Sequence, residues 1–213
     1  MPQPSDIQTI GTPFVELQSV DSTNNYARTR IRASGLPERQ GGGHHGMAIF
    51  AHEQVAGKGQ RGKKWVSRKD QNIALSVLIK PANLAVGQQF QLSAAVALAV
   101  QQFFRKYAGD ECRIKWPNDL YWQDRKAGGI LIENIISGSG IWDWAIVGIG
   151  ININQVQFPD DLPNPVALKQ ITGKDSDPCL LAKELCSCLD IQYRRLSEEG
   201  FAPVYQDYLS QLY

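Results

Sequence analysis

The chain has few of the residues that mark membrane, secreted or metal-binding proteins. Its 213 residues include four cysteines, three histidines and two methionines. No apolar run reaches the roughly 18 residues of a membrane span, and the N-terminus lacks the features of a signal peptide. Cys112, Cys179, Cys186 and Cys188 lack the paired spacing of a zinc site, which predicts reduced, mostly buried thiols. These absences favour a cytoplasmic protein with no membrane partner and no tightly bound metal.

Histidine chemistry is also poorly supported. His44, His45 and His52 have no ligand-like spacing, and no arrangement of acids around them in the sequence suggests a triad. We therefore assign the three histidines no role.

The net charge is small, but the basic residues are concentrated in one stretch. There are 22 Lys and Arg residues against 21 Asp and Glu, a formal net charge of +1. Residues 57–69 carry six of the positive charges and no acid. A duplex-binding domain usually spreads basic charge over a whole face. The sequence therefore indicates a small anionic ligand and no nucleic-acid partner.

Length and patterning fit a single α+β domain. An apolar content of 43% is ample for one core. Strands are expected at 14–20, 47–52, 73–80 and 142–154, and helices at about 21–33, 87–108, 177 onward and 201–212. Strands in the middle of the chain and helices at its flanks predict a mostly antiparallel mixed sheet with flanking helices.

The run at 115–133 is the most informative segment. Pro117, Asn118 and Asp119 favour a turn between a strand that ends at Trp116 and one that begins near Leu120. A second turn at 123–125 should lead to a strand over 130–132. Gly128 and Gly129 would let a ligand or another backbone approach closely.

The stretch at 57–64, GKGQRGKK, matches G-x-G-x-x-G and nearly matches a Walker A motif. Both matches are rejected, because no helix is expected directly after the loop and no acid follows about 20 residues later. Its glycines and cations could still bind an anion through backbone N–H groups and charge. A solvated surface loop is the alternative.

The run KWPNDLYWQDRKAGGILIE at 115–133 resembles the signature of the biotin protein ligases, which join biotin to a carrier-protein lysine through biotinyl-AMP. The resemblance extends over about residues 14–212. It implies the fold of that family's catalytic domain, which class II aminoacyl-tRNA synthetases share. It further implies one catalytic domain over 1–213, without the usual small C-terminal β-barrel domain and without an N-terminal DNA-binding domain.

The resemblance assigns roles to particular residues. Lys126 would bridge the biotin carboxylate and the α-phosphate, Lys115 would assist on the phosphates, and Asp119 would hold Mg²⁺ or orient the incoming amine. The positions matched to biotin or adenylate contacts are Ser22, Thr23, Asn24, Gln54, Gly57, Lys58, Gly59, Gln60, Arg61, Trp65, Asn118, Gly129 and Asn152. Without the resemblance, residues 22–24 are a helix N-cap and the charged residues are solvated turn residues.

Two segments carry further expectations. The loop departs from the family pattern GRGRxGR at Lys58 and Gln60, where arginines are common, so bidentate phosphate contacts should be weaker. Gly148 and Gly150, in the strand expected over 142–154, would admit a neighbour's side chain, and the resemblance places this strand along the ligand cleft.

The implied activity is an ATP-dependent ligase that forms biotinyl-5'-AMP and transfers biotin to a biotin carboxyl carrier protein. Its substrates would be biotin and ATP with Mg²⁺, and relatives often form homodimers. A lipoate ligase or octanoyltransferase on a similar fold is the nearest alternative. A non-catalytic nucleotide or nucleic-acid binding module is the second.

Overall fold

A seven-stranded sheet forms the centre of the molecule in the computed structural model, which describes residues 9–33, 44–81, 83–160 and 162–213. The strand order is β1-β2-β3-β7-β6-β5-β4, and only β1 and β2 run parallel. The strands are β1 (Phe14–Leu17), β2 (Ala48–Ala51), β3 (Asn72–Ile79), β4 (Cys112–Lys115), β5 (Asp119–Trp122), β6 (Arg125–Ile136) and β7 (Trp142–Asn152). The expected mostly antiparallel mixed sheet is confirmed.

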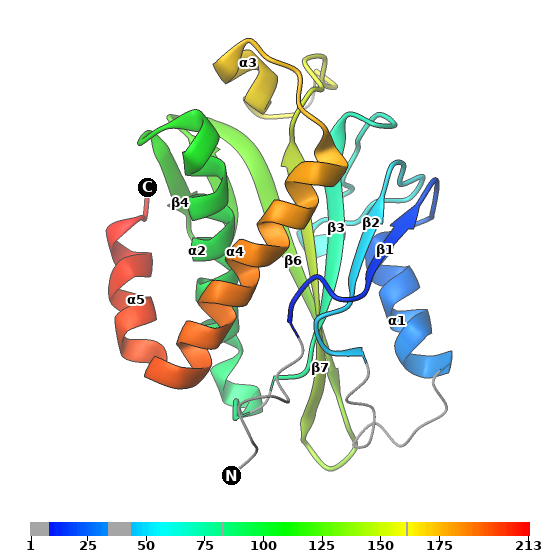
Figure 1. Cartoon of the computed structure of the whole chain (residues 1–213), viewed down its shortest axis with the longest axis vertical. Coiled ribbons are helices and arrows are strands. Elements are labelled where there is room, and N and C mark those ends of the chain that lie inside the picture. Colours follow the sequence, from blue (N-terminus) through cyan, green and yellow to red (C-terminus); the bar gives the residue numbers. More distant parts are fainter. Residues whose placement is uncertain (1–8, 34–43, 82, 161) are drawn as a thin grey trace.

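Helices cover the two faces of this sheet unequally (Figure 1). One face packs against a layer of three helices, α2 (Gln89–Ala108), α4 (Pro178–Glu199) and α5 (Phe201–Ser210). The other face carries α1 (Thr23–Ala33), which contacts β2, β3 and β7. The short helices are η3 (Gln60–Gly62), η4 (Val86–Gln88) and α3 (Leu168–Thr172). Because α1 covers only part of its face, the rest of that face can hold a ligand.

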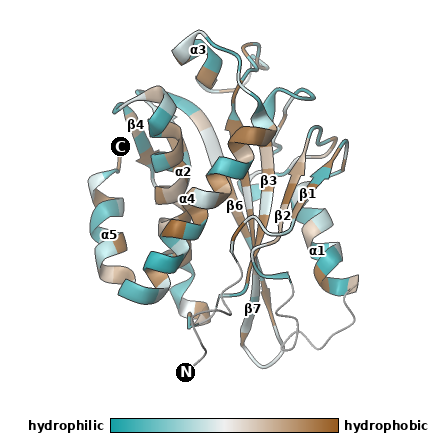
Figure 2. Cartoon of the chain, viewed as in Figure 1, coloured by the Kyte–Doolittle hydropathy of each residue, from teal (hydrophilic) through white to brown (hydrophobic). Residues whose placement is uncertain are grey.

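Two apolar clusters follow from this layering. The larger lies between the sheet and α2, α4 and α5, and includes Leu75, Phe103 and Leu185. The smaller joins α1 to the opposite sheet face through Ala27, Ile49 and Trp144. Apolar segments accordingly line the inner side of the helices and most of the central strands (Figure 2). Burial of alternate strand residues on each face is what fixes the register of such a sheet.

The expected elements are confirmed, with shifted ends. The first strand stops at Leu17, and residue 20 makes only an isolated bridge to Gln54. The strand expected over 130–132 starts already at Arg125, so Gly128 and Gly129 lie inside β6. They pair with Ile151 and Gly150 of β7. Helix α3 was not expected, because five residues carry too little periodicity to be recognised.

Helix α4 begins as its sequence predicts. The Asp177 carboxylate accepts hydrogen bonds from the backbone N–H groups of Cys179 and Leu180 at 2.8 and 3.1 Å, and Pro178 occupies the first turn. The four cysteines are free and buried, as expected. Burial raises the pKa of Cys112 and of Cys186 to about 12.

The assignment of no role to His52 was incomplete, because the fold brings acids to it. Its Nε2 lies 2.7 Å from Glu16 Oε1 on β1, and its Nδ1 lies 2.6 Å from Asp70 Oδ1. The hydrogen bond to Glu16, and next the one to Asp70, raises the pKa of His52 above its ordinary value. The sequence concealed this contact, since Glu16 is 36 residues away.

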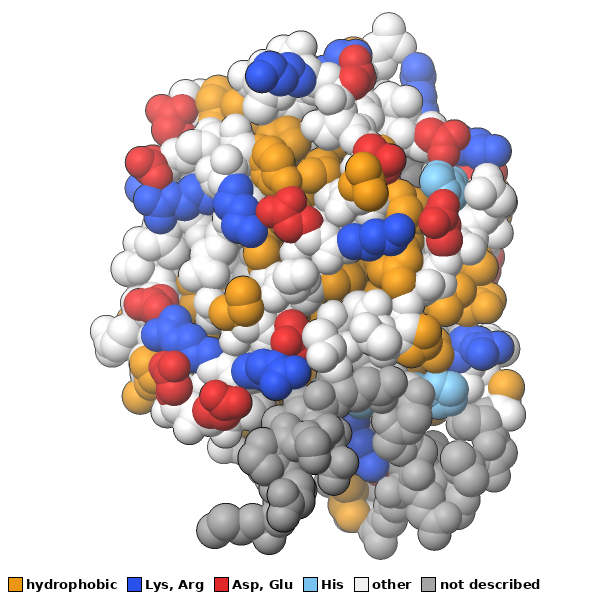
Figure 3. Space-filling model, viewed as in Figure 1, with side chains coloured by type: hydrophobic (Ala, Val, Ile, Leu, Met, Phe, Trp, Pro, Cys, Tyr) orange, Lys and Arg blue, Asp and Glu red, His pale blue; other side chains and the backbone are white. Residues whose placement is uncertain are grey.

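Charged side chains of both signs are interspersed over the helical face of the molecule (Figure 3). No helix among the described residues is long and apolar enough to cross a membrane.

Candidate functional site

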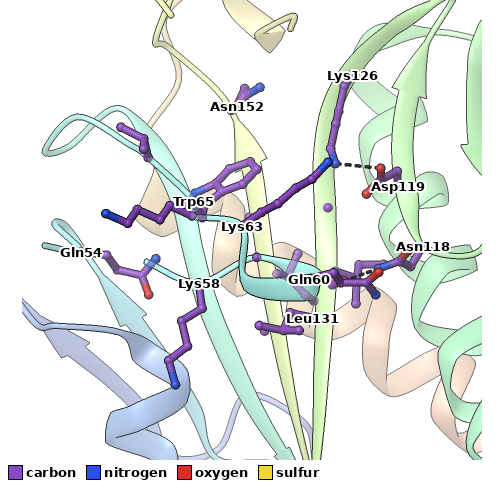
Figure 4. Close-up of a pocket in the computed structure, with 18 of the residues that line it drawn as sticks. Gln54, Lys58, Gln60, Lys63, Trp65, Asn118, Asp119, Lys126, Leu131 and Asn152 are labelled. Carbon is purple, nitrogen blue, oxygen red and sulfur yellow. Dashed lines mark hydrogen bonds and ion pairs between the residues drawn. The ribbon is translucent and has the colours of Figure 1, made fainter. Parts of the chain in front are cut away.

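A pocket of about 500 Å³ opens on the sheet face that α1 leaves uncovered. Residues from the start of α1, from β3, β6 and β7, from the segment after β2 and from the turn before β5 line it. All the site residues expected from the sequence line this pocket except Gly57 and Lys115. Segments that are far apart in the chain therefore converge on one cavity (Figure 4).

An ion pair lies at one side of the pocket. Lys126 Nζ of β6 is 2.7 Å from Asp119 Oδ2 of β5, with about a third of each side chain exposed (34% and 32%). Gly129 leaves room for the pair, since a Cβ there would lie 3.2 Å from Asp119 Oδ1 and 3.5 Å from Lys126 Nζ. Both charges therefore remain accessible from the pocket (Figure 4).

Asn118 stabilises the turn that presents Asp119. Its Nδ2 donates to the Ile130 carbonyl, and its own carbonyl accepts from Ile130 N at 3.2 Å. The side chain is buried, and the preceding Trp116-Pro117 peptide bond is cis. The expected turn is confirmed, with Asn118 joining β5 to β6.

Hydrogen-bonding side chains line the opposite side of the pocket, at the start of α1. Gln54 Oε1 accepts from Thr23 N at 2.8 Å and from Thr23 Oγ1 at 3.0 Å. Ser76 Oγ of β3 lies 2.7 Å from Thr23 Oγ1 and 2.6 Å from Asn24 Oδ1. Helix α1 begins at Thr23, within the segment where a helix start was expected, and the polar side chains there belong to the pocket as well.

The basic loop forms a compact hairpin over the pocket. Lys58 and Lys64 make an antiparallel bridge, and η3 forms the turn between them, with Arg61 in the left-handed region (φ 53°). Gly57 lies at the base, where its carbonyl accepts from Trp65 N at 3.0 Å. Residues 63–71 are irregular before β3 begins, so the rejection of the dinucleotide and Walker A motifs is confirmed.

Two glycines of β7 allow side chains to reach the sheet. A Cβ on Gly150 would lie 2.5 Å from the Trp65 ring, and one on Gly148 would lie 2.5 Å from Asn24 Oδ1. The expectation that these glycines admit neighbouring side chains is thus confirmed. Trp65 Nε1 is buried and has no hydrogen-bond partner among the described residues.

The loop cations point in different directions. Lys58 Nζ donates to Asn25 Oδ1 of α1 at 2.5 Å, away from Lys126. Lys63 instead extends toward Lys126 and Asp119 (Figure 4). Sequence reasoning gave Lys63 no individual role, although its place at the last basic position of the loop motif was a usable signal.

Lys115 does not join the other predicted residues. It ends β4, at the edge of the sheet. Its Nζ lies 3.3 Å from the phenol oxygen of Tyr121 and 4.7 Å from the centre of that ring. The lysine is exposed and is not part of the pocket lining. Its expected contact with the phosphates stays a prediction.

The loop after β7 adds pocket residues that sequence reasoning missed. Phe158, Leu162, Pro163 and Pro165 line the pocket. Asn152 Nδ2 joins this loop to the strand by donating to the Val166 carbonyl at 3.1 Å. Apolar and proline residues in a loop carry no distinctive chemistry, so only the fold could reveal their place.

The pocket therefore has hydrogen-bonding groups near β2 and α1 and converging cations near β6. Strands β3 and β7 separate the two sides in the sheet order. Such a cavity suits a ligand with a polar head, an apolar middle and an anionic end. Asp119 is the one carboxylate in the described lining, and Mg²⁺ that arrives with a triphosphate needs only one or two protein carboxylates. No group of three or more potential metal ligands occurs among the described residues.

Comparisons with known proteins agree on one family. The model of the biotin/lipoate A/B protein ligase family matches residues 17–152. The chain is 34% identical over 199 residues to the bifunctional ligase/repressor BirA of Escherichia coli, covering 91% of this chain and 57% of that protein. It is 32% identical over 171 residues to the biotin--[acetyl-CoA-carboxylase] ligase of Paracoccus denitrificans, covering 76% and 69%. The chain spans about half the length of the BirA proteins it matches.

Solved structures extend the match to the fold. The biotin protein ligase of Aquifex aeolicus in complex with biotin and ATP superposes with a TM-score of 0.76 at 28% identity, covering 93% of this chain and 78% of that one. That of Leishmania major in complex with biotinyl-5-AMP gives a TM-score of 0.74 at 27% identity, covering 94% and 81%. The expected biotin ligase fold is confirmed. The family model matches more than half of this chain, and the related sequences agree with it. The chain therefore belongs to the biotin/lipoate A/B protein ligase family.

Proposed function

We propose that this chain is an ATP-dependent biotin protein ligase. It activates biotin as biotinyl-5'-AMP and then transfers the biotinyl group to a lysine of a biotin carboxyl carrier protein. The observation that carries the proposal is the pocket that joins the Lys126 and Asp119 pair to the polar start of α1. A ligand held between these two sides presents its carboxylate to the cations and its polar head to Thr23, Asn24 and Gln54.

The first step must bring two anions together. A biotin carboxylate oxygen attacks the α-phosphorus of ATP, an O–P bond forms, and pyrophosphate leaves with the electron pair of the bond that breaks. Lys126 offsets the repulsion between the carboxylate and the phosphate, and Lys63 adds positive charge from the loop. Trp65, packed on Gly150, covers the ligand and limits access of water.

The second step transfers the biotinyl group. The carrier lysine amine attacks the carbonyl carbon of the mixed anhydride, AMP leaves with the electrons of the C–O bond, and the amine loses a proton to solvent. Asp119 can orient the incoming amine, because its carboxylate faces the pocket and already accepts one ammonium group from Lys126 at 2.7 Å.

Magnesium would accompany the nucleotide. Asp119 is the residue that would hold it, and the ion would neutralise charge on the phosphates.

Biotin is preferred over lipoate as the acid. The start of α1 offers several fixed hydrogen-bonding groups, and the ureido ring of biotin can use them, whereas the dithiolane ring of lipoate cannot. The names of the related ligases from Paracoccus denitrificans and Mycobacterium tuberculosis also specify biotin. A carboxyl carrier protein as partner, a single catalytic domain, homodimer formation and a cytoplasmic location remain predictions of the same proposal.

Exchange of labelled pyrophosphate into ATP tests the proposal. The wild-type chain should catalyse exchange when biotin is present and should not do so when lipoate or octanoate replaces biotin. Exchange with lipoate alone would favour the alternative activity of the family. Folded protein that supports exchange with none of the three acids would contradict the proposal.

A further inference from the structure

The side chain of Asn24 is held from three adjacent strands. It is 3% exposed, at the start of α1, and contacts residues of β3, β7 and β6. Ser76 pairs with Gly148 in the sheet, and Gly148 pairs with Leu131, so Glu133 lies two residues further along the same face of β6. None of Ser76, Glu133 and Arg28 lines the pocket, whereas Asn24 does.

The contacts fix which end of the Asn24 amide points where. Asn24 Nδ2 donates to Glu133 Oε2 at 2.8 Å, and Ser76 Oγ lies 2.6 Å from Asn24 Oδ1. An ionised carboxylate only accepts hydrogen bonds, so the amide NH₂ must face Glu133. A flipped amide would place its oxygen against the carboxylate, which would be repulsive.

Arg28 supports this arrangement from the next turn of the helix. Its Nη2 lies 3.3 Å from Glu133 Oε1, the oxygen that Asn24 does not use. Each of the two Glu133 oxygens thus has its own donor from α1. The two contacts hold the carboxylate in place, with the side chains of Glu133 and Arg28 24% and 30% exposed.

Gly148 completes the setting by leaving space. A Cβ at this position would lie 2.5 Å from Asn24 Oδ1 and 3.1 Å from its Nδ2. The amide consequently lies flat against β7, with one hydrogen of Nδ2 and one lone pair of Oδ1 not used by Glu133 or Ser76. Those two groups are available to a ligand in the pocket.

We propose that Glu133, supported by Arg28, and Ser76 are positioning residues that lock the Asn24 amide for recognition of the cyclic urea of biotin. The proposal rests on the proposed function and adds residues that do not touch the ligand. A cyclic urea carries N–H donors and a carbonyl acceptor on a rigid ring. An amide that is already held in one orientation can match that pattern without losing further freedom on binding. An amide that flips freely must lose that freedom when the ligand binds.

Biotin titration calorimetry without ATP tests the lock. Glu133→Gln keeps the size of the side chain but lets it donate as well as accept, so the amide loses its fixed orientation. We expect its Kd for biotin to rise roughly tenfold, the equivalent of about one hydrogen bond. In pyrophosphate exchange, KM for biotin should rise while kcat at saturating biotin stays close to the wild-type value. Glu198→Gln, at an exposed site near the end of α4, is the matched control and should leave both unchanged.

A double-mutant cycle separates positioning from a general structural effect. Because Glu133 acts through Asn24, Glu133→Gln should cause no further loss of biotin affinity in an Asn24→Ala background. Ser76→Ala should also raise the Kd for biotin, and provides the test if Glu133→Gln proves unstable by thermal unfolding. Because Ser76 Oγ also lies 2.7 Å from Thr23 Oγ1, the effect of Ser76→Ala should shrink in the Asn24→Ala background without vanishing. Unchanged biotin affinity in both single variants, or an equal loss in the Asn24→Ala background, would overturn the positioning role alone. Failure of the wild-type chain to bind biotin would overturn the proposed function together with it.

Discussion

At the scale of single residues, the pocket depends as much on missing side chains as on present ones. Gly148 leaves space for Asn24, and Gly150 leaves space for Trp65. Gly129 leaves space for the ion pair of Lys126 and Asp119. Two of these glycines lie in β7 and the third in β6, the central strands under the pocket. Glycine normally weakens a strand, so three of them around one cavity indicate that side chains or ligands need the space.

Gly150→Ala should therefore impair ligand binding. The added methyl would lie 2.5 Å from the Trp65 ring and force the loop off the sheet. We expect biotin affinity measured by calorimetry to fall by about tenfold or more, since a displaced aromatic ring loses most of its contacts. Gly138→Ala, in the β6–β7 turn where nothing lies within 4 Å, is the control. Equal affinity of the two variants would show that Trp65 does not pack on Gly150 in solution.

His52 should make stability depend on pH. Its pKa is raised in the folded state by the hydrogen bonds to Glu16 and Asp70. A raised folded pKa means that this stabilisation is complete below the unfolded value of about 6.5 and is lost as pH rises through the folded value. Between about pH 6 and the raised pKa, the Tm of the wild-type protein should therefore fall more than the Tm of His52→Asn. Parallel Tm profiles for the two proteins would contradict the assignment.

At the scale of elements, the basic hairpin at 57–66 supplies the pocket with both an aromatic ring and a cation. Trp65 faces the sheet, whereas Lys63 extends toward Lys126 (Figure 4). The hairpin is held mainly by its own backbone hydrogen bonds, Gly59 N to Lys63 O at 2.7 Å and Trp65 N to Gly57 O at 3.0 Å. Substitution of one of its lysines should consequently affect a ligand more than the fold.

Lys63→Gln should weaken the use of ATP selectively. Loss of one charge near the phosphates is expected to raise KM for ATP roughly tenfold in pyrophosphate exchange. The Kd for biotin measured without ATP should change little, because the groups proposed to bind the biotin ring lie at the start of α1. Lys174→Gln removes an exposed charge outside the pocket and serves as the control. A larger change in the Kd for biotin than in the KM for ATP would contradict a position of Lys63 beside the phosphates.

The N-terminus of α4 gives a prediction about stability alone. Asp177→Ala removes the acceptor for the N–H groups of Cys179 and Leu180, and should lower the free energy of unfolding by about 1 kcal/mol. Urea denaturation with a shared m-value measures the difference. Asp160→Ala, an exposed acid in the loop after β7, should change it far less. An equal effect of the two variants would argue against the cap.

Sequence reasoning succeeded where chemistry is local. Asn118, Asp119, Lys126 and Gly129 lie within one hairpin, so their proximity follows from the turn that Pro117 introduces. It could not place Lys115, because spacing along the hairpin does not show that β4 forms the sheet edge and that this lysine lies near Tyr121.

At the scale of the whole molecule, the site is assembled from segments that only the sheet brings together. Ser76 is far from Glu133 and Gly148 in the chain, yet the three surround one amide because β3, β7 and β6 are neighbours. Pairing across such distances leaves no trace in local periodicity. The contacts of His52 with Glu16 and Asp70 escaped the sequence for the same reason.

The most direct test of the account is formation of biotinyl-AMP from biotin and α-labelled ATP by the wild-type chain and by Lys126→Ala. We expect the wild-type chain to accumulate labelled biotinyl-AMP, and the variant to lose at least about 99% of the rate, because one electrostatic contact to a developing charge contributes about a hundredfold or more. Lys174→Ala should match the wild-type chain. Biotinyl-AMP formed by folded Lys126→Ala at the wild-type rate, or none formed by the wild-type chain, would contradict the account.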